Sequence, residues 1–547
     1  MTNLRMQICL IVLLVPIALS AADDKPVSLT GSLQHDGLFA LKDPAINTEY
    51  YDFPYLSNTY LDLLLNSKYV SAGMRIETMQ APLPGFNSDF RGSGVGNLFV
   101  QGRWKWVRLT LGDVYAQFGS GLILRLYEER SLGLDNSLRG GKLELTPYKG
   151  IRIEALGGKQ RVYWNCYNHT AWNLDMTKGA AVGANLELDI DQWSKTLREK
   201  EIGINIGASW VSKYQPADTI YHSINPPVIY NLPKWVGATD ARIRINYKSW
   251  DLLAEYAWKA NDPSADNNYS YKPGQALLLS LSYSRKGLSV LAQVKRSENM
   301  SFRSDRQRRD NAAQLNHLPS FTYAHTYHLT ALNGYATQLR GEWAFQGEVC
   351  YTWAKKTPMG GRYGTTLRLQ GSHIRGTSDT NWWGMTADPY YTDVHIELNK
   401  RMQKRWSLNA MYMYQTFNAQ VIEGHGGIYR SHILVADLKY ITSDNVQMRA
   451  ELQYLFSKQD EGQWIYALYE LSLFGDLMLS ASDMYNIGGT ATSTHNHFYT
   501  FAASYQIGRH YISASYMRTR EGYNCTGGIC HFVPAQKGVT LNYSLKF

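Results

Sequence analysis

The last ten residues of the chain, GVTLNYSLKF at positions 538–547, alternate between two kinds of side chain. One face of the segment carries large apolar residues, and the other carries small or polar residues. A period of two residues is the signature of a β-strand with one apolar face. The segment therefore predicts a strand that ends on the aromatic residue Phe547.

The same alternation recurs along the chain, for example in IGINIGASW (202–210), ARIRINY (241–247), TDVHIELNK (392–400) and VQMRAELQY (446–454). These segments approach the roughly ten residues with which a tilted strand crosses a bilayer. Very short connections between the segments alternate with long ones, as in outer-membrane barrels. Aromatic residues beside the short connections would form an interfacial girdle: Tyr69, Trp104, Trp106, Tyr148, Tyr247, Trp250, Trp406 and Tyr511.

The start of the chain resembles a secretory signal peptide, which we expect to span residues 1–22. Arg5 lies in a short polar head, an apolar run follows from Ile8 to Leu19, and small residues lead to Ala22. No later stretch approaches the roughly 18 consecutive apolar residues of a membrane helix. We therefore expect an exported protein whose residues 23–547 form a single domain.

The predicted fold is an all-β, transmembrane, antiparallel up-and-down barrel of about 24 strands, with short periplasmic turns and long extracellular loops. The region 298–390 is the hardest to divide, and a further strand near Tyr327–Leu332 would raise the number to about 26. A soluble β-sandwich also alternates. The expected signal peptide, the one-sided loop lengths and the aromatic residues at the turns favour the membrane barrel.

The C-terminal segment resembles the C-terminal signal of outer-membrane barrels, whose pattern Gly538, Tyr543, Leu545 and Phe547 match. This resemblance implies location in the outer membrane of a Gram-negative cell, in contact with its lipids. It also implies that the barrel-assembly machinery recognises the last strand, which then closes against the first.

A barrel this wide would enclose an aqueous channel unless something fills it. Few residues separate the expected cleavage site from the first strand near Val27, so we expect no separate plug domain there. The loop at 112–142 is densely charged yet rich in leucine, and we expect it to fold inward as a constriction; an ordered surface loop is the alternative. The loop residues Arg125, Glu128, Glu129, Arg130, Asp135 and Arg139 would face Arg75, Glu77, Arg152 and Glu154 on neighbouring strands.

The loop at 112–142 resembles a family of Bacteroidota outer-membrane barrels with no assigned activity, together with NLFVQGRWKWVRLTLGDVYAQFG (97–119) before it and LGGKQRVYW (156–164) after it. The resemblance covers most of the chain after residue 22 and is densest between residues 57 and 165. It implies the fold and the location, but it supplies no catalytic or binding residues.

The sequence gives few signals for covalent, catalytic or metal-binding chemistry. Cys525 and Cys530 are close enough for a disulfide in the last outer loop, although two free thiols remain the alternative. His395 would face the lumen, but no serine is placed with it, so we expect no enzyme. The spacing of His317, His325 and His328 matches no metal signature, and we expect neither a metal nor a cofactor. The net charge of +9 is spread along the chain, which argues against nucleic-acid binding.

The sequence is compatible with two functions. The first is a porin-like channel for polar solutes, constricted by the loop at 112–142. The second is a non-conducting subunit or scaffold of a larger outer-membrane complex for secretion, assembly or uptake.

Overall fold

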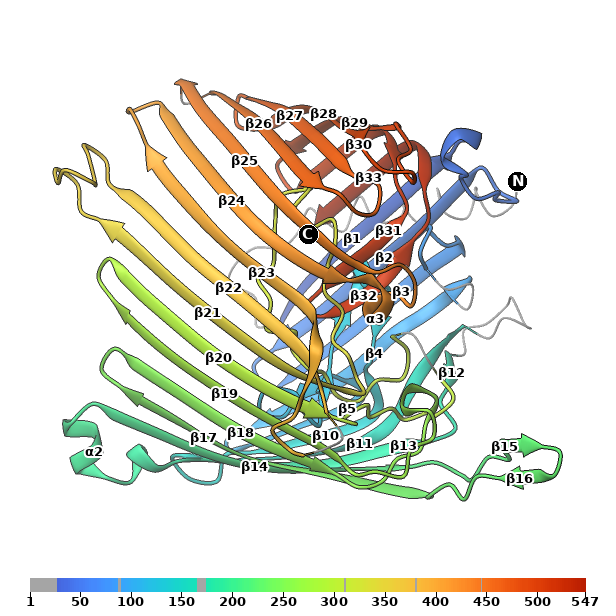
Figure 1. The fold of residues 1–547 in the computed structure, drawn as a ribbon. Coiled ribbons are helices and arrows are strands. Elements are labelled where there is room, and N and C mark those ends of the chain that lie inside the picture. Colours follow the sequence, from blue (N-terminus) through green and yellow to red (C-terminus); the bar gives the residue numbers. More distant parts are fainter. Residues whose placement is uncertain (1–26, 87–89, 165–173, 309–310, 379–380, 444) are drawn as a thin grey trace.

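The computed structural model describes residues 27–86, 90–164, 174–308, 311–378, 381–443 and 445–547. Within them, 24 strands form one closed antiparallel barrel (Figure 1). The barrel strands are β1 (Val27–Ala40), β2 (Tyr55–Ser67), β3 (Val70–Ala81), β4 (Gly92–Trp104), β5 (Val107–Val114), β10 (Leu138–Leu145), β11 (Ile151–Trp164), β13 (Ala180–Asp189), β14 (Ile202–Tyr214), β17 (Trp235–Tyr247), β18 (Trp250–Lys259), β19 (Gly274–Arg285), β20 (Leu288–Glu298), β21 (Gly341–Trp353), β22 (Thr365–Thr377), β23 (Met385–Arg401), β24 (Trp406–Asn418), β25 (Ile428–Ser443), β26 (Val446–Ser457), β27 (Gln463–Leu473), β28 (Leu477–Gly488), β29 (His497–Ile507), β30 (His510–Thr519) and β33 (Gln536–Lys546).

The barrel closes where the sequence predicted, between the first strand and the last. In the β1–β33 ladder Leu33 lies opposite Leu545. The N–H of Gly31 donates to the carbonyl oxygen of Phe547 over 2.8 Å. A Cβ atom at Gly31 would lie 2.5 Å from the Phe547 ring, so a larger residue at this position would displace the ring. The C-terminal aromatic side chain thus packs directly on the first strand.

The predicted number of strands is confirmed, and the alternative with a strand near Tyr327–Leu332 is wrong. Residues 327–332 form turns between β20 and β21. From the alternation, two strands were predicted to begin near residues 97 and 390, and these are the largest errors among the strand starts. The corresponding strands β4 and β23 begin at Gly92 and Met385. The expected signal peptide lies outside the described residues.

The two faces of each barrel strand differ as the alternation predicted. On β17, Asp240 and Arg242 are buried on the lumen side, whereas Trp235 and Ile243 are exposed on the outer side. Leu452 on β26 is likewise exposed on the outer wall. A closed barrel with an apolar outer face satisfies every backbone group of the sheet and presents hydrocarbon to lipid, which is the structure of a transmembrane barrel.

The connections at the two ends of the barrel are unequal. At one end most turns are tight, such as residues 68–69 and 248–249, with η5 (Ile190–Gln192) and α2 (Lys195–Glu199) in a longer one. The other end carries the long loops, and their elements are η2 (Pro44–Ile46), β6 (Ala116–Gln117), β7 (Arg125–Leu126), β8 (Glu128–Glu129), η4 (Arg130–Leu132), β9 (Leu134–Asp135), β12 (Leu174–Met176), β15 (Tyr221–Ile224), β16 (Pro227–Ile229), η6 (Ala265–Asn267), α3 (Ala419–Ile422), β31 (Gly522–Thr526) and β32 (Ile529–Val533).

Among the described residues, no helix has the length and apolar composition that crossing a membrane requires.

The largest hydrophobic core lies inside the barrel, not between layers of sheet. Phe118, Leu122 and Ile123 are fully buried in it, together with Phe302 and Leu315. These residues belong to two long-loop segments, residues 115–137 and residues 299–340, and we call the two segments together the plug. Figure 1 draws the second segment as coil between the walls of the barrel.

Candidate functional site

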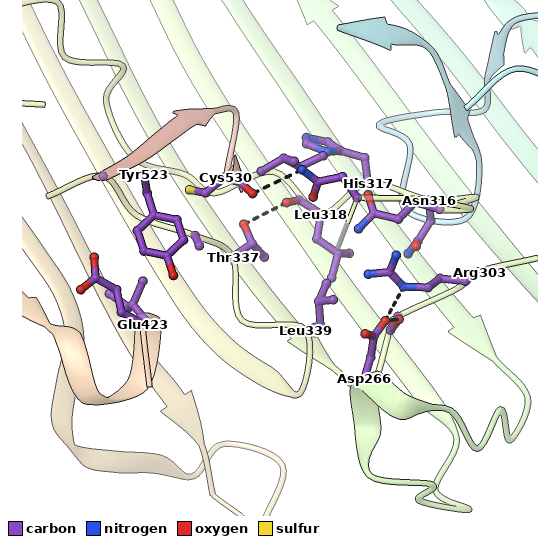
Figure 2. A pocket seen from close by; sticks show the side chains of 18 residues that line it. Asp266, Arg303, Asn316, His317, Leu318, Thr337, Leu339, Glu423, Tyr523 and Cys530 are labelled. Atoms are coloured by element: carbon purple, nitrogen blue, oxygen red, sulfur yellow. Dashed lines mark hydrogen bonds and ion pairs between the residues drawn. The ribbon is translucent and has the colours of Figure 1, made fainter. Parts of the chain in front are cut away.

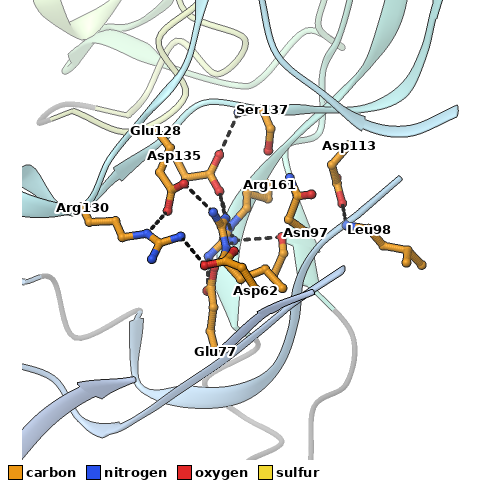
Figure 3. Close-up of polar contacts among 12 residues, drawn as sticks. Asp62, Glu77, Asn97, Leu98, Asp113, Glu128, Arg130, Asp135, Ser137 and Arg161 are labelled. Carbon is orange, nitrogen blue, oxygen red and sulfur yellow. Dashed lines mark hydrogen bonds and ion pairs between the residues drawn. The ribbon is translucent and has the colours of Figure 1, made fainter. Parts of the chain in front are cut away.

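The plug segment 115–137 is attached to the wall through a buried cluster of charges (Figure 3). Arg75 on β3 contacts Glu77 (Nε–Oε1, 2.8 Å), Glu128 (Nη1–Oε2, 2.5 Å) and Asp135 (Nη2–Oδ2, 2.5 Å). Arg161 on β11 contacts Glu77 at 2.9 Å and Asp135 at 3.3 Å. Charge-assisted hydrogen bonds of this kind are strong, and removing one partner leaves a buried charge uncompensated.

The ionisation of Asp135 follows from this arrangement. Burial alone would raise the pKa of its carboxyl group, but Arg161 and Arg75 lower it, and the net pKa lies below the ordinary value. Asp135 is therefore ionised at neutral pH and holds both guanidinium groups.

A second contact fixes the same segment to β2. Arg130 pairs with Asp62 (Nη2–Oδ2, 2.9 Å) and with Glu128 (Nε–Oε1, 2.7 Å). Its guanidinium group also lies over the ring of Tyr60, 4.4 Å from the centroid. Stacking of this kind suits the planar charge of arginine. The segment is thus tied to β2, β3 and β11.

The plug segment 299–340 is attached in a different way. Three buried lysines of the wall donate to its main-chain carbonyl oxygens: Lys213 to Arg303 over 2.6 Å, Lys259 to Ser301 over 2.6 Å, and Lys295 to Pro319. The charges of these lysines are balanced by carboxylates at the long-loop end of the wall. Asp262 lies 2.6 Å from Lys213, and Glu342 lies 2.6 Å from Lys295.

The same segment reaches the opposite wall. The hydroxyl group of Tyr327 donates to Asp437 on β25 over 3.2 Å and accepts from Asn409 on β24 over 2.6 Å. The N–H of Leu329 donates to the side-chain oxygen of Gln453 on β26 over 2.8 Å. Because its contacts run from β14 to β26, the segment crosses the lumen.

The two plug segments are joined to each other by hydrogen bonds. The N–H of Arg125 donates to the oxygen of Leu315 over 2.7 Å, and the N–H of His317 donates to the oxygen of Gly121 over 2.9 Å. The side chain of Gln160 on β11 donates to the oxygen of Asn136 over 3.2 Å and to that of Gln314 over 2.7 Å. The two segments and the wall therefore form one packed unit.

His317 stays neutral inside this unit. Burial lowers the pKa of its imidazole to about 3, and the positive charges of Arg125 and Lys295 act in the same direction. The ring therefore adds no charge to the plug at neutral pH.

A cavity of about 300 Å³ lies on the long-loop side of the plug (Figure 2). Its floor is formed by plug residues, and the hairpin β31–β32 lies across it. Cys525 and Cys530 are joined by a disulfide in that hairpin. The N–H of Thr337 donates to the oxygen of Gly528 over 3.0 Å, which holds the hairpin against the plug. Polar and apolar side chains mix around the cavity, including Asp266, Arg303, Asn316, Leu339, Glu423 and Tyr523.

Comparison with known proteins places the chain in a family. The model of DUF6029, a family of unknown function, matches residues 1–547. The chain belongs to the DUF6029 family. No curated protein matches it.

Solved structures with a similar fold include outer-membrane proteins. A mutant of the ferric enterobactin receptor PfeA from Pseudomonas aeruginosa is 9% identical, with 95% of this chain and 80% of that chain covered and a TM-score of 0.42. The copper transporter OprC is 10% identical, with 96% and 82% covered and a TM-score of 0.40. The outer membrane protein opdK from Pseudomonas aeruginosa is 10% identical, with 83% and 98% covered and a TM-score of 0.36. These likenesses concern the fold alone. This DUF6029 chain is an outer-membrane multi-pass β-barrel, by its closed sheet and its apolar outer face.

The residues that the sequence singled out are placed in three groups. Arg75 and Glu77 lie against the plug segment 115–137, where Glu128, Arg130 and Asp135 contact the wall. Arg152 and Glu154, expected to join them, instead lie next to each other (Nε–Oε1, 3.9 Å) away from the plug. The remaining three residues contact nearby groups. Arg139 pairs with Asp113 on β5, Arg125 stacks on Tyr127, and Glu129 caps η4.

Several residues that hold the plug were not predicted from the sequence. Arg161, which takes the place expected for Arg152 and Glu154, follows Gln160 on β11, and both are buried. Two consecutive inward residues break the alternation, and the β11–β12 register is irregular beyond Arg161. The lysines that hold the segment 299–340 do follow the alternation of their strands. An inward-facing lysine at the long-loop end of a strand was the signal that could have identified them.

Proposed function

We propose that this barrel is an outer-membrane conduit for small polar solutes that its own plug keeps closed at rest. The observation that carries the proposal is the plug segment 299–340, which crosses the lumen and is fastened to both walls by polar contacts. A barrel of this width would otherwise be an open aqueous channel. Hydrogen bonds and ion pairs to the wall can be exchanged for water or solute, so a plug held in this way can be displaced.

The cavity above the plug is where a solute would act. It is lined by Arg303 and Asn316 of the plug and by Asp266 of a neighbouring loop. Arg303 and Asp266 form an ion pair (Nε–Oδ2, 2.5 Å). A solute with a carboxylate or several hydroxyl groups would compete for these groups. Its binding would loosen the side of the plug that faces the long loops.

A second function, a non-conducting scaffold in a larger complex, is favoured by a different feature. The hairpin β15–β16 extends beyond the rim of the barrel (Figure 1). It exposes Tyr221, Val228 and Ile229. Exposed apolar residues at the end of an arm are typical of a surface that contacts another protein.

Permeation through the purified protein tests the proposal. Proteoliposomes containing the intact barrel would be compared with empty liposomes in swelling assays with monosaccharides and amino acids. A variant in which residues 303–337 are replaced by a short Gly-Ser linker is the open control. We expect slow but measurable entry of some solutes through the intact barrel and fast entry of all of them through the variant.

The scaffold predicts a different result. If the intact barrel admits none of these solutes while the linker variant admits all, the plug is a permanent seal and the conduit is excluded. Co-purification of a stoichiometric partner under mild detergent, lost when the tip of the hairpin β15–β16 is shortened, would then support the scaffold.

A further inference from the structure

A cluster of metal-binding side chain types lies where the plug meets the far wall. His325 comes from the plug segment 299–340, whereas Asp393 and His395 come from the lumen side of β23. One nitrogen or oxygen atom of each residue lies within 4.8 Å of the others. His325 is already hydrogen-bonded to Asp393 (Nε2–Oδ2, 2.8 Å).

Among the described residues, the wall residues of this cluster carry polar atoms that have no partner. His395 is 1% exposed, and neither of its ring nitrogens makes a hydrogen bond to a described residue. Asp393 is fully buried, and its Oδ1 makes no hydrogen bond within the described part of the chain. Gln370, directly opposite His395 in the β22–β23 ladder, is also buried, and its Oε1 has no partner in the described ranges. Each such group costs about 1–3 kcal/mol when it is buried without a partner. A ligand that accepts lone pairs would remove part of this cost, by binding one ring nitrogen of His395 and a carboxylate oxygen of Asp393.

The ring of Tyr323 restricts the two imidazoles. Its centroid lies 5.2 Å from that of His325 and 4.8 Å from that of His395. The Tyr323 hydroxyl group is held in turn by Arg368, which donates to it over 3.1 Å. The two histidine rings are thereby kept beside Asp393.

We propose that His325, Asp393 and His395 bind a divalent transition metal ion. Two imidazoles and one carboxylate suit Zn²⁺ and Fe²⁺, whereas Ca²⁺ and Mg²⁺ prefer oxygen ligands. Tetrahedral coordination with bonds of about 2.1 Å places ligand atoms about 3.4 Å apart. The ligand atoms now lie within 4.8 Å of one another, so the widest pair would have to approach by up to about 1.4 Å around the ion. A fourth position stays free for water or for a donor atom of a solute.

The position of the site gives the ion a structural effect. One ligand belongs to the plug and two belong to β23, so a bound ion ties the plug to the wall. The site lies on β23, three strands further along the wall than β20, which carries Lys295. Metal binding itself requires only the folded barrel and does not depend on whether the barrel conducts.

Metal titration of the purified, chelator-stripped barrel tests the site. Calorimetry with Zn²⁺ and visible absorption with Co²⁺ should both report a single ion per chain. His395→Gln, Asp393→Asn and His325→Gln should each weaken binding at least tenfold. His328→Gln is the matched control: His328 lies in the same plug segment and stacks on Tyr466 outside the cluster, so binding should be unchanged. Heat-modifiable migration in gels verifies that each variant is a folded barrel.

Hydrogen exchange gives an independent measurement of the tie. Addition of Zn²⁺ should slow exchange at residues 323–329 in the unaltered chain and in His328→Gln, but not in His395→Gln. Absence of stoichiometric binding, or equal binding by the unaltered chain and His395→Gln, would overturn the site. Permeation is measured separately, so a silent barrel that still binds the ion would reject only the conduit.

Discussion

The two plug segments close the same lumen with different chemistry. Segment 115–137 is held by ion pairs to β2, β3 and β11, which are near it in the sequence. Segment 299–340 is held from β14 to β26, and at one wall lysine side chains donate to its main-chain oxygens. The first attachment depends on the side chains of the loop itself. The second depends mainly on the wall, because every residue offers a carbonyl oxygen.

The largest expected effect comes from removing each segment in turn. Replacing residues 303–337 by a short linker removes the part that crosses the lumen, whereas deleting residues 120–136 removes one side only. Both changes should raise single-channel conductance in planar bilayers, and the first should raise it several-fold more. Equal conductance in the two variants would mean that the segments occlude the lumen equally.

The contrast also explains what the sequence could predict. The wall was predicted almost strand by strand because alternation is a local property of each segment, as in residues 202–210. The loop at 112–142, which contains segment 115–137, was expected to fold inward because its own composition, with Arg130 and Asp135 among leucines, is unsuited to a solvated loop. Its partners were predicted only in part, because the irregular end of β11 concealed Arg161.

Segment 299–340 was harder to predict for a physical reason. Its attachments use backbone oxygens, such as those of Ser301 and Arg303, and backbone groups leave no pattern in a sequence. Side-chain contacts such as Tyr327 with Asp437 join residues far apart in the chain. From the sequence, residues 327–332 were therefore considered only as a possible additional strand.

The next largest effect concerns the charges that hold segment 115–137. Arg161→Met leaves Glu77 and Asp135 buried with one fewer cation, which should destabilise the attachment by about 3–5 kcal/mol. Arg152→Met is the matched control on the same strand, because Arg152 is exposed, and its loss should cost less than about 1 kcal/mol. Hydrogen exchange at residues 128–137 measures the difference. Equal exchange in the two variants would contradict the role assigned to the buried cluster.

A smaller effect is expected among the lysines that hold segment 299–340. Lys295→Met removes the donor to Pro319 and the cation 2.6 Å from Glu342, so we expect a loss of about 3 kcal/mol. Lys259→Met should cost about 1.5 kcal/mol. Lys259 is 3.9 Å from Asp262, and in the variant Asp262 keeps its closer partner Lys213 at 2.6 Å.

Limited proteolysis within residues 301–319 would rank these two lysine variants. If Lys259→Met lost more protection than Lys295→Met, the distance from each lysine to its carboxylate would not determine how strongly that lysine holds the segment.

The smallest expected effect, counted for one pH unit and one histidine, is a difference in pH dependence between the two segments. The pKa of His317 is lowered to about 3 by burial and by two positive charges, while a released plug would restore it to about 6.5. The released state therefore binds a proton below pH 6.5 that the packed state binds only near pH 3, and acidification destabilises segment 299–340 throughout that window. The slope is at most about 1.4 kcal/mol per pH unit. Burial also lowers the pKa of His328, so His328 contributes to the pH dependence with the same sign.

Asp135 in segment 115–137 responds differently, because it is an acid. Its pKa is lowered, so its stabilising contribution to that segment is complete above the ordinary carboxyl pKa of about 3.8 and is lost only at lower pH.

Hydrogen exchange between pH 6.5 and pH 4.5, corrected for its intrinsic rate, tests this difference. Exchange should accelerate in residues 311–329 and stay constant in residues 128–137. The double variant His317→Gln, His328→Gln should remove the acceleration. Equal acceleration of both segments would indicate loosening of the whole barrel, whereas persistence in the double variant would assign the effect to other groups.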